Sequence, residues 1–275
     1  MSEHVLNVIA DDARPVAHAL RTFGEPHWLS EGRAFDLPFD AEALALARTL
    51  PCNANAVPAT NRRKKLLIAD MDSTIITCEC LDELADRAGL KPRIAAITER
   101  AMRGEIAFVP ALRERVSLLK GLPLAALART YDERVRLTPG AKVLVATMKA
   151  HGARTVLVSG GFSYFTSRVR EAAGFDADQA NVLIDDGKAL TGEVREPVLG
   201  REAKLATLQS QGVDPHDVLA VGDGANDLDM IRAAGLGVAF HAKPVVAEAA
   251  QARIDHGDLR ALLYLQGYSD GEIVG

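Results

Sequence analysis

"LLIADMDSTIIT", residues 66–77, sets a run of four apolar residues directly against two acids. Asp70 and Asp72 stand one residue apart, and Ser73 and Thr74 follow them. Two carboxylates at the end of a buried strand repel each other and lose hydration, so they need a cation or a shared proton. The stretch therefore predicts a buried strand whose carboxyl end carries a charged site.

The chain after residue 65 alternates short apolar runs with helical patterns. The runs are rich in Val, Leu and Ile, which is typical of parallel strands that helices cover on both faces. We place these strands in "KLLIAD" (65–70), "ARTVLVSGG" (153–161), "DVLAVGDG" (217–224) and "GLGVAF" (235–240). Helical segments are expected near 141–151, 162–173, 201–211 and 225–234. The predicted fold class is α/β, with a doubly wound, Rossmann-like parallel-sheet core.

Two insertions interrupt this core, and a smaller unit precedes it. Residues 79–136 contain several helical stretches and no convincing strand, so we expect a helical cap over the edge of the sheet. Residues 181–195 are predicted to form a hairpin with Asp186-Gly187 at its turn. We expect residues 1–60 to form a small α+β unit of unknown role, separate from the larger core at 65–275.

The N-terminal unit shows simple local signals. "HVLNVIA" predicts a strand, and residues 13–23 and 41–50 have helical spacing, with Asp40 as the cap of the second helix. "PCNANAVPATNRR" (51–63) is rich in Pro, Asn and Ala, which favours a linker. The basic run at residues 62–65 is predicted to be a solvated part of that linker.

Composition and charge limit the partners. The chain has 275 residues and a net charge of −5, and no basic patch is interleaved with aromatic residues, so nucleic acid is not an expected partner. No apolar stretch approaches ~18 residues and the N-terminus lacks a basic start, so we expect no membrane association. Cys52, Cys78 and Cys80 do not have zinc-site spacing and are expected to be reduced thiols of a cytoplasmic protein. Assembly into a homo-oligomer is left open.

Three of the predicted strands end in polar motifs, "DMDST" (70–74), "SGG" (159–161) and "GDGAND" (222–227). Ligands of open α/β sheets bind beyond the carboxyl ends of the strands, so these motifs are expected to meet. A hard divalent cation such as Mg²⁺ would neutralise the four acids that would then crowd together, Asp70, Asp72, Asp223 and Asp227. We expect "SGG" to open a helix and to offer backbone N–H groups to a phosphate.

A phosphate beside carboxylates and Mg²⁺ indicates phosphoryl transfer. Asp70 is the candidate nucleophile, whose attack on phosphorus would give an aspartyl-phosphate. Asp72 is the candidate general acid/base, because a neighbouring like charge raises its pKa and lets it carry a proton to the leaving alcohol. The sequence shows no nucleophile elbow, no Walker loop and no GxGxxG motif, which would have indicated other chemistries.

These motifs carry a resemblance to a known family. "DMDST" resembles the DxDx[TV] signature of the haloacid dehalogenase-like hydrolases, and "VLVSGG" and "GDGAND" are similar to their second and fourth motifs, from about residue 65 to the end. "DMDSTIITCECLDELA", "GEIAFVPALRERVSLLKG" and "GDGANDLDMIRAAGLGVAFHAKP" resemble more narrowly the phosphoserine phosphatases within that superfamily. The resemblance implies Mg²⁺-dependent hydrolysis of O-phospho-L-serine through an aspartyl-phosphate, as the last step of L-serine biosynthesis.

The resemblance also implies roles for single residues. Asp70 corresponds to the nucleophile and Asp72 to the acid/base, whose backbone carbonyl binds Mg²⁺ together with the carboxylates of Asp70 and Asp223. Glu79 corresponds to the residue that holds the substrate ammonium, and Arg115 to the one that holds its carboxylate. The remaining matches are Asp227 as a supporting acid near the metal, Ser159, Gly160 and Asn226 as phosphate contacts, and Met102 and Phe108 as cap residues that close over the substrate.

The sequence departs from the family at the lysine that neutralises the phosphate. The family places this lysine at the start of the helix before "GDGAND", where this chain has Arg201, and Lys204 follows almost one turn later. Residues three apart share a helix face, so either side chain could reach the phosphate. We favour Lys204, because a compact ammonium suits a point contact beside Asp70.

Two other functions stay open at this point. The same mechanism could serve another small phosphomonoester, such as phosphothreonine or phosphohomoserine, because one methyl or methylene is worth only ~1–3 kcal/mol of discrimination. A non-catalytic sensor of phosphorylated amino acids, signalling through residues 1–60, is a candidate from another class. The presence of both Asp70 and Asp72 argues against this sensor.

Overall fold

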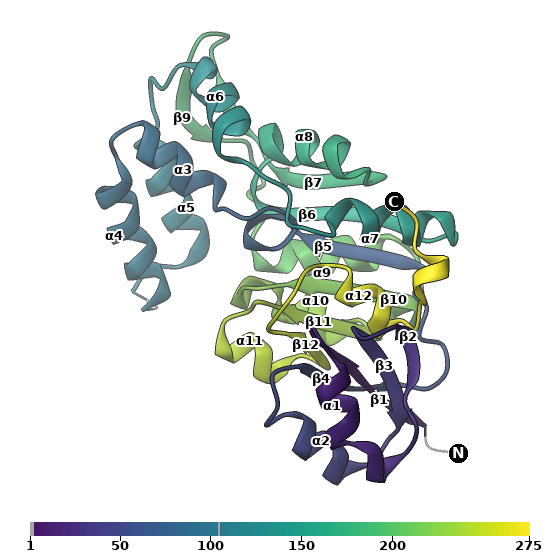
Figure 1. The fold of residues 1–275 in the computed structure, drawn as a ribbon. Helices are drawn as coiled ribbons and strands as arrows, with labels where there is room; N and C mark the ends of the chain where they lie inside the picture. Colours follow the sequence, from purple (N-terminus) through teal and green to yellow (C-terminus); the bar gives the residue numbers. More distant parts are fainter. Residues whose placement is uncertain (1–2, 104) are drawn as a thin grey trace.

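The centre of the molecule is a six-stranded parallel sheet with the order β12-β11-β10-β5-β6-β7, seen in the computed structural model in Figure 1. The structure describes residues 3–103 and 105–275. The strands are β5 (Leu66–Asp70), β6 (Arg154–Phe162), β7 (Ala177–Asn181), β10 (Val218–Gly222), β11 (Leu236–Phe240) and β12 (Ala252–Ile254). Because β5 pairs with both β6 and β10, its carboxyl end stands in the middle of one edge of the sheet.

Helices cover both faces of this sheet (Figure 1). They are α7 (Ala141–Ala150), α8 (Ser163–Ala173), α9 (Arg201–Ser210), α10 (Leu228–Ala233), α11 (Pro244–Ala249) and α12 (Ala261–Leu265). Leu67 of β5 belongs to the same buried apolar cluster as Leu144 of α7, whereas Ile68 belongs to a second cluster with Leu208 of α9. Successive strand residues point to opposite faces, so both faces are buried and the predicted doubly wound α/β core is confirmed.

A helical cap follows β5 and stands beyond the carboxyl edge of the sheet (Figure 1). Its helices are α3 (Cys80–Arg87), α4 (Lys91–Met102), α5 (Phe108–Ser117) and α6 (Leu124–Arg134), and the described part of residues 79–136 contains no strand. The predicted hairpin is confirmed as β8 (Leu183–Asp185) and β9 (Leu190–Val194), with Gly187 at φ +87° in its turn. It packs on the cap, because the Gly121 N–H donates to the carbonyl of Leu190 at 2.8 Å.

Residues 4–58 form a second, antiparallel sheet in the order β2-β3-β1-β4. Its strands are β1 (His4–Ile9), β2 (His27–Ser30), β3 (Ala34–Pro38) and β4 (Asn53–Pro58), and its helices are α1 (Arg14–Ala19) and α2 (Ala41–Ala47). The Asp40 carboxylate accepts from the N–H groups of Glu42 and Ala43, as expected for the cap of α2. That this sheet and its helices fold as a separate domain stays a prediction.

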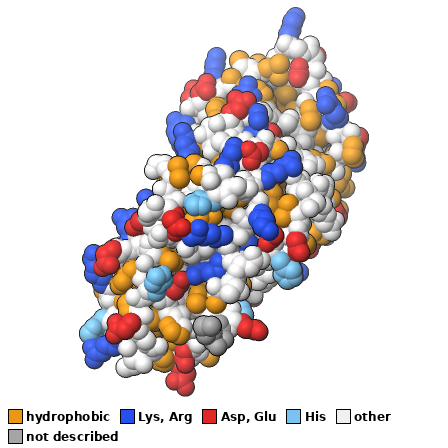
Figure 2. Space-filling view, turned by 90° about the vertical axis from the view of Figure 1, so that its right-hand side faces the viewer, with side chains coloured by type: hydrophobic (Ala, Val, Ile, Leu, Met, Phe, Trp, Pro, Cys, Tyr) orange, Lys and Arg blue, Asp and Glu red, His pale blue; other side chains and the backbone are white. Residues whose placement is uncertain are grey.

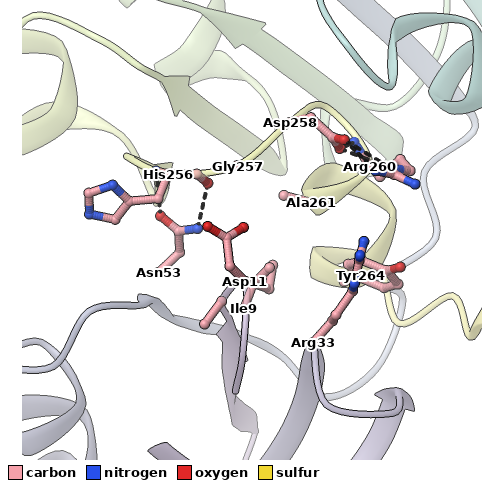
Figure 3. A pocket seen from close by; sticks show the side chains of 11 residues that line it. Ile9, Asp11, Arg33, Asn53, His256, Gly257, Asp258, Arg260, Ala261 and Tyr264 are labelled. Carbon is pink, nitrogen blue, oxygen red and sulfur yellow. Dashed lines mark hydrogen bonds and ion pairs between the residues drawn. The ribbon is translucent and has the colours of Figure 1, made fainter. Parts of the chain in front are cut away.

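The linker predicted for residues 51–63 is wrong at residues 53–58, because β4 lies there and pairs with β1. Its asparagines, which suggested a loop, bind the edge of the central sheet. Asn55 donates to the carbonyl of Arg253 at 3.0 Å and accepts from the N–H of the same residue at 2.8 Å. Figure 3 shows Asn53 reaching the backbone at His256 in the same way, at 2.8 Å. Side-chain amides therefore continue the hydrogen bonding of β12 into the N-terminal sheet.

The basic run at residues 62–65 is solvated at Arg63 and Lys65, as predicted, but not at Arg62 and Lys64. The guanidinium of Arg62 is nearly buried and pairs with Asp36, with Nη1 2.5 Å from Oδ2. Lys64 is 5% exposed, and its ammonium donates to the carbonyls of Asn61 and His216. Asp36 lies on β3, so Arg62 ties the N-terminal sheet to the chain that enters β5. Arg62 and Lys64 are buried or nearly so because acceptors inside the protein bind their charged groups, and the local sequence does not show those acceptors.

The outer surface is of mixed charge. On the face drawn in Figure 2, acidic and basic side chains lie intermixed rather than gathered by sign. Among the described residues, the longest helix is α4 with 12 residues, and no helix is both long and apolar enough to cross a bilayer.

Candidate active site

A cavity of about 430 Å³ lies between the carboxyl edge of the central sheet and the cap. The three strand ends predicted to converge all reach it, from β5, β6 and β10. The predicted site residues that line it are Asp70, Asp72, Glu79, Phe108, Arg115, Ser159, Gly160, Asp223 and Asn226. Lys204 and Asp227 are buried beneath them and contact Asp70 or its neighbours. The side chain of Met102 falls outside the described part of the chain.

The loop after β5 turns sharply to present two acids to the cavity. Ser73 has a φ of +56°, an uncommon conformation for a residue with a side chain, and its N–H donates to the carbonyl of Cys78. The turn leaves Asp72 between two donors. Its Oδ1 accepts from the N–H of Cys80 at 2.8 Å, and its Oδ2 from the hydroxyl of Ser159 at 3.0 Å. Burial raises the pKa of Asp72, and these hydrogen bonds oppose the rise.

Lys204 supplies the positive charge beneath the acids. Its ammonium donates to Oδ1 of Asp70 and to Oδ1 of Asp227, and all three side chains are 6% exposed or less. Burial alone would lower the pKa of Lys204, but the charges of Asp227 and Asp70 outweigh it and raise that pKa. Arg201, the alternative cation, instead pairs with Asp229 near the surface.

The acids retain more negative charge than Lys204 neutralises. Burial, followed by the charge of Asp227, raises the pKa of Asp70 well above its usual range, although Lys204 opposes this. Burial and Asp227 likewise raise the pKa of Asp223 to about 6. For Asp70 and Asp223 both to be ionised at neutral pH, this cluster would need a further cation.

The residues present fit a hard divalent metal ion. Carboxylate oxygens of Asp70, Asp223 and Asp227 all lie within 4.8 Å of one another, and oxygen donors suit such ions. Asp227 is already committed to protein donors, because Oδ1 accepts from Lys204 and Oδ2 from the N–H of Gly224 at 3.0 Å. Among the described residues, neither Oδ2 of Asp70 nor the carboxylate of Asp223 accepts from another side chain, so these groups are less committed to protein donors than Asp227.

The "SGG" motif differs from the prediction that it opens a helix. Ser159, Gly160 and Gly161 all belong to β6, and α8 begins only at Ser163. The space for a side chain is tight at Gly161 and ordinary at Gly160. A Cβ on Gly161 would lie 3.0 Å from Oδ2 of Asp72, and one on Gly160 would lie 3.4 Å from the ring of Phe108. The closeness of Phe108 to Gly160 also shows that the cap reaches the core at the carboxyl end of β6.

The cap contributes two opposite charges to the cavity. The carboxylate of Glu79 accepts from the hydroxyl of Ser73 at 2.6 Å. Its partial desolvation and the charge of Asp72 raise the pKa of Glu79 to about 7. Burial lowers the pKa of the Arg115 guanidinium, although the acids Asp82 and Glu79 partly compensate. Within the described residues, no carboxylate lies within ion-pair distance of Arg115 (4.0 Å).

The sequence prediction missed three polar residues that line the cavity, Asp82, Thr98 and Lys243. Lys243 follows the carboxyl end of β11, so the strand-end argument could have found it. Its N–H donates to the carbonyl of Asp223, and its charge lowers the pKa of that residue against the burial effect. Asp82 and Thr98 lie within cap helices, where no local pattern sets them apart.

Known proteins match this chain over most of its length. A sequence profile described as haloacid dehalogenase-like hydrolase matches residues 67–232, and a second with the same description matches residues 202–263. A phosphoserine phosphatase of Polaromonas sp. is 47% identical over 210 residues, which are 73% of this chain and 89% of the relative. A probable phosphoserine phosphatase of Schizosaccharomyces pombe is 39% identical over 260 residues, 91% of this chain and 87% of that protein.

A solved structure extends the likeness to the fold. The unliganded probable phosphoserine phosphatase of Vibrio cholerae superposes with a TM-score of 0.81 at 32% identity. The superposition covers 96% of this chain and 86% of that one, so it includes the N-terminal sheet as well as the core and the cap.

Proposed function

This chain belongs to the haloacid dehalogenase-like hydrolases, and we propose that within this family it hydrolyses O-phospho-L-serine to L-serine and phosphate. The choice of substrate rests chiefly on the surroundings of Arg115. A half-buried guanidinium with no acid partner among the described residues shares its cavity with the carboxylate of Glu79 and with the two acids after β5. This set of charges complements a small molecule that carries a carboxylate, an ammonium and a phosphate.

Each charge of phosphoserine finds an opposite one in the proposed complex. Arg115 would bind the carboxylate through its planar fork, and Glu79 the ammonium. The phosphate would be held by Ser159, the backbone of Gly160, Asn226 and Lys204. Phe108, which contacts Gly160, would close over the ester together with Met102. The relatives from Polaromonas and Schizosaccharomyces pombe carry this substrate in their names, which supports the same choice.

The reaction we propose has two steps. A carboxylate oxygen of Asp70 attacks phosphorus, an aspartyl-phosphate forms, and the bond from phosphorus to the serine oxygen breaks as Asp72 donates a proton to that oxygen. Water then attacks phosphorus while Asp72 takes a proton from it, which releases phosphate and restores both acids. Asp70, Asp223 and the backbone carbonyl of Asp72 would hold Mg²⁺. When bound, this ion would supply positive charge that offsets the repulsion of the phosphate by the carboxylates.

The test is phosphate release from phosphoserine, phosphothreonine, phosphohomoserine, phosphoethanolamine and an aryl phosphate, each with and without Mg²⁺. We expect activity that depends on Mg²⁺, with the highest kcat/KM for phosphoserine. A flat profile would keep the two-step chemistry and discard phosphoserine as the substrate. Binding of phosphoserine without any turnover would instead identify the chain as a sensor.

A further inference from the structure

Two neutral acceptors hold the guanidinium of Arg115 in the cavity. Its Nε donates to the carbonyl of Ala111 at 3.3 Å, one turn back on α5. Its Nη1 donates to Oγ1 of Thr98 at 3.4 Å, which comes from the neighbouring helix α4. One contact holds the stem of the group and the other its plane, so together they favour one orientation of the guanidinium.

The hydroxyl of Thr98 can act here only as an acceptor. Its own proton goes to the carbonyl of Ile94, 3.1 Å away and one turn back on α4. The lone pairs of the oxygen are thereby left for Arg115. Thr98 also lines the cavity, so the bond is made at the wall where a ligand would meet the guanidinium.

The cap contains a second arginine that donates to a helix threonine, and this arginine also has a carboxylate partner. Thr130 on α6 donates to the carbonyl of Ala126 at 2.8 Å and accepts from Nε of Arg87 at 3.2 Å. The guanidinium of Arg87 is then completed by an ion pair with Glu133. Arg115 has a threonine partner, Thr98, but no carboxylate partner among the described residues. A carboxylate supplied from outside the chain would complete it in the same manner.

We propose that Thr98 is a positioning residue, which orients Arg115 for a substrate carboxylate and so selects phosphomonoesters that carry one. The inference rests on the proposed function and extends it to a residue outside the recognised motifs. Within the described residues, the hydrogen bonds of the Thr98 side chain go to Ile94 and Arg115, and none goes to the strand ends or to the acids after β5. Its loss should therefore affect recognition of the carboxylate and leave the chemical step unchanged.

The test compares Thr98→Val and Thr98→Ser with the wild type, on phosphoserine and on phosphoethanolamine, which is phosphoserine without its carboxylate. For Thr98→Val we expect KM for phosphoserine to rise about three- to tenfold with kcat within twofold, as for loss of one hydrogen bond. The kcat/KM for phosphoethanolamine should stay within twofold. Thr98→Ser keeps the acceptor and should restore the KM of the wild type.

Thr130→Val is the matched control, because it removes the same pair of bonds beside an arginine that already has its carboxylate. It should leave KM for phosphoserine unchanged, whatever it does to the melting temperature. In an Arg115→Ala background, Thr98→Val should have no further effect on KM. Thr98→Ala serves as a second variant if the valine impairs folding.

The outcomes separate this inference from the function on which it rests. If the wild type had equal kcat/KM for phosphoserine and phosphoethanolamine, recognition of a substrate carboxylate would no longer be part of the proposed function. The positioning role of Thr98 would then fail as well. A wild type that prefers phosphoserine, with Thr98→Val equal to it or impaired alike on both substrates, would overturn the positioning role alone.

Discussion

The floor and the roof of the cavity are built on opposite plans. The floor, formed by Asp70, Lys204 and Asp227, is almost fully buried, and its charged groups are paired with one another. The roof, formed by Glu79, Thr98 and Arg115 of the cap, is partly exposed, and its two charges have neutral partners in place of opposite ones. The floor positions its charges through ion pairs within the chain and would need only a metal ion, whereas the charges of the roof have no opposite charge bound to them among the described residues.

The difference indicates a division of labour. Buried, mutually bonded charges are fixed in place, so they can serve chemistry that is the same for every phosphomonoester. Charges without a partner gain most from a ligand that supplies one, so the roof can distinguish one ester from another. Changes to the floor should therefore affect all substrates alike, and changes to the roof only those with the matching group.

The largest effect is expected from Asp70→Asn. The amide is nearly isosteric but cannot attack phosphorus, so kcat should fall by roughly 10⁴-fold or more on every substrate, phosphoethanolamine and aryl phosphate included. Single-turnover assays would measure the remaining rate, and circular dichroism would show that the fold is kept. An active Asp70→Asn protein would refute the nucleophile, and loss confined to phosphoserine would break the division between floor and roof.

Lys204→Met should show how much the floor depends on its one buried cation. The change leaves Asp70 and Asp227 buried without their partner, which should cost about 3–5 kcal/mol of unfolding free energy in metal-free buffer. Added Mg²⁺ should recover part of the loss, because an ion that binds only the folded chain stabilises it. Urea unfolding monitored by circular dichroism, with and without Mg²⁺, measures both quantities.

Arg201→Met is the control for that variant. Arg201 starts the same helix, but its ion pair with Asp229 is partly exposed. Its loss should cost about 1 kcal/mol or less and should not respond to Mg²⁺. Equal losses for the two variants would mean that burial of the Lys204 cluster contributes little to stability.

The sequence revealed the floor because buried parallel strands have a plain signature. β5, β6, β10 and β11 are covered on both faces, so each is a continuous apolar run, and the acids at their ends stand out. The strands at the margin of the sheet lack that signature. β7, "ADQAN", is mostly half-buried and polar, and β12 has only three residues, so neither was predicted.

The roof was less accessible to sequence reasoning, for a physical reason. Thr98 and Arg115 are 17 residues apart and meet only because α4 packs against α5. Nothing in the local pattern around Thr98 sets it apart from an ordinary helix threonine. The same holds for Asn53 and Asn55, which are typical loop residues by their local sequence and whose acceptors on the 253–256 segment lie about 200 residues away. Contacts of this kind require the tertiary structure.

Arg115→Ala tests the difference between the floor and the roof most directly. Its effect should be smaller than that of Asp70→Asn and confined to substrates that carry a carboxylate. Loss of a charged, two-pronged contact is worth about 1.5–3 kcal/mol, so KM for phosphoserine should rise roughly 10- to 100-fold with little change in kcat. For phosphoethanolamine, which has no carboxylate, KM should stay within about twofold. Arg113→Ala is the control, because Arg113 lies on the same helix and already pairs with Glu196 at the exposed surface. If Arg115→Ala instead lowered kcat for both substrates, the guanidinium would take part in the chemistry, and the roof could no longer be separated from the floor.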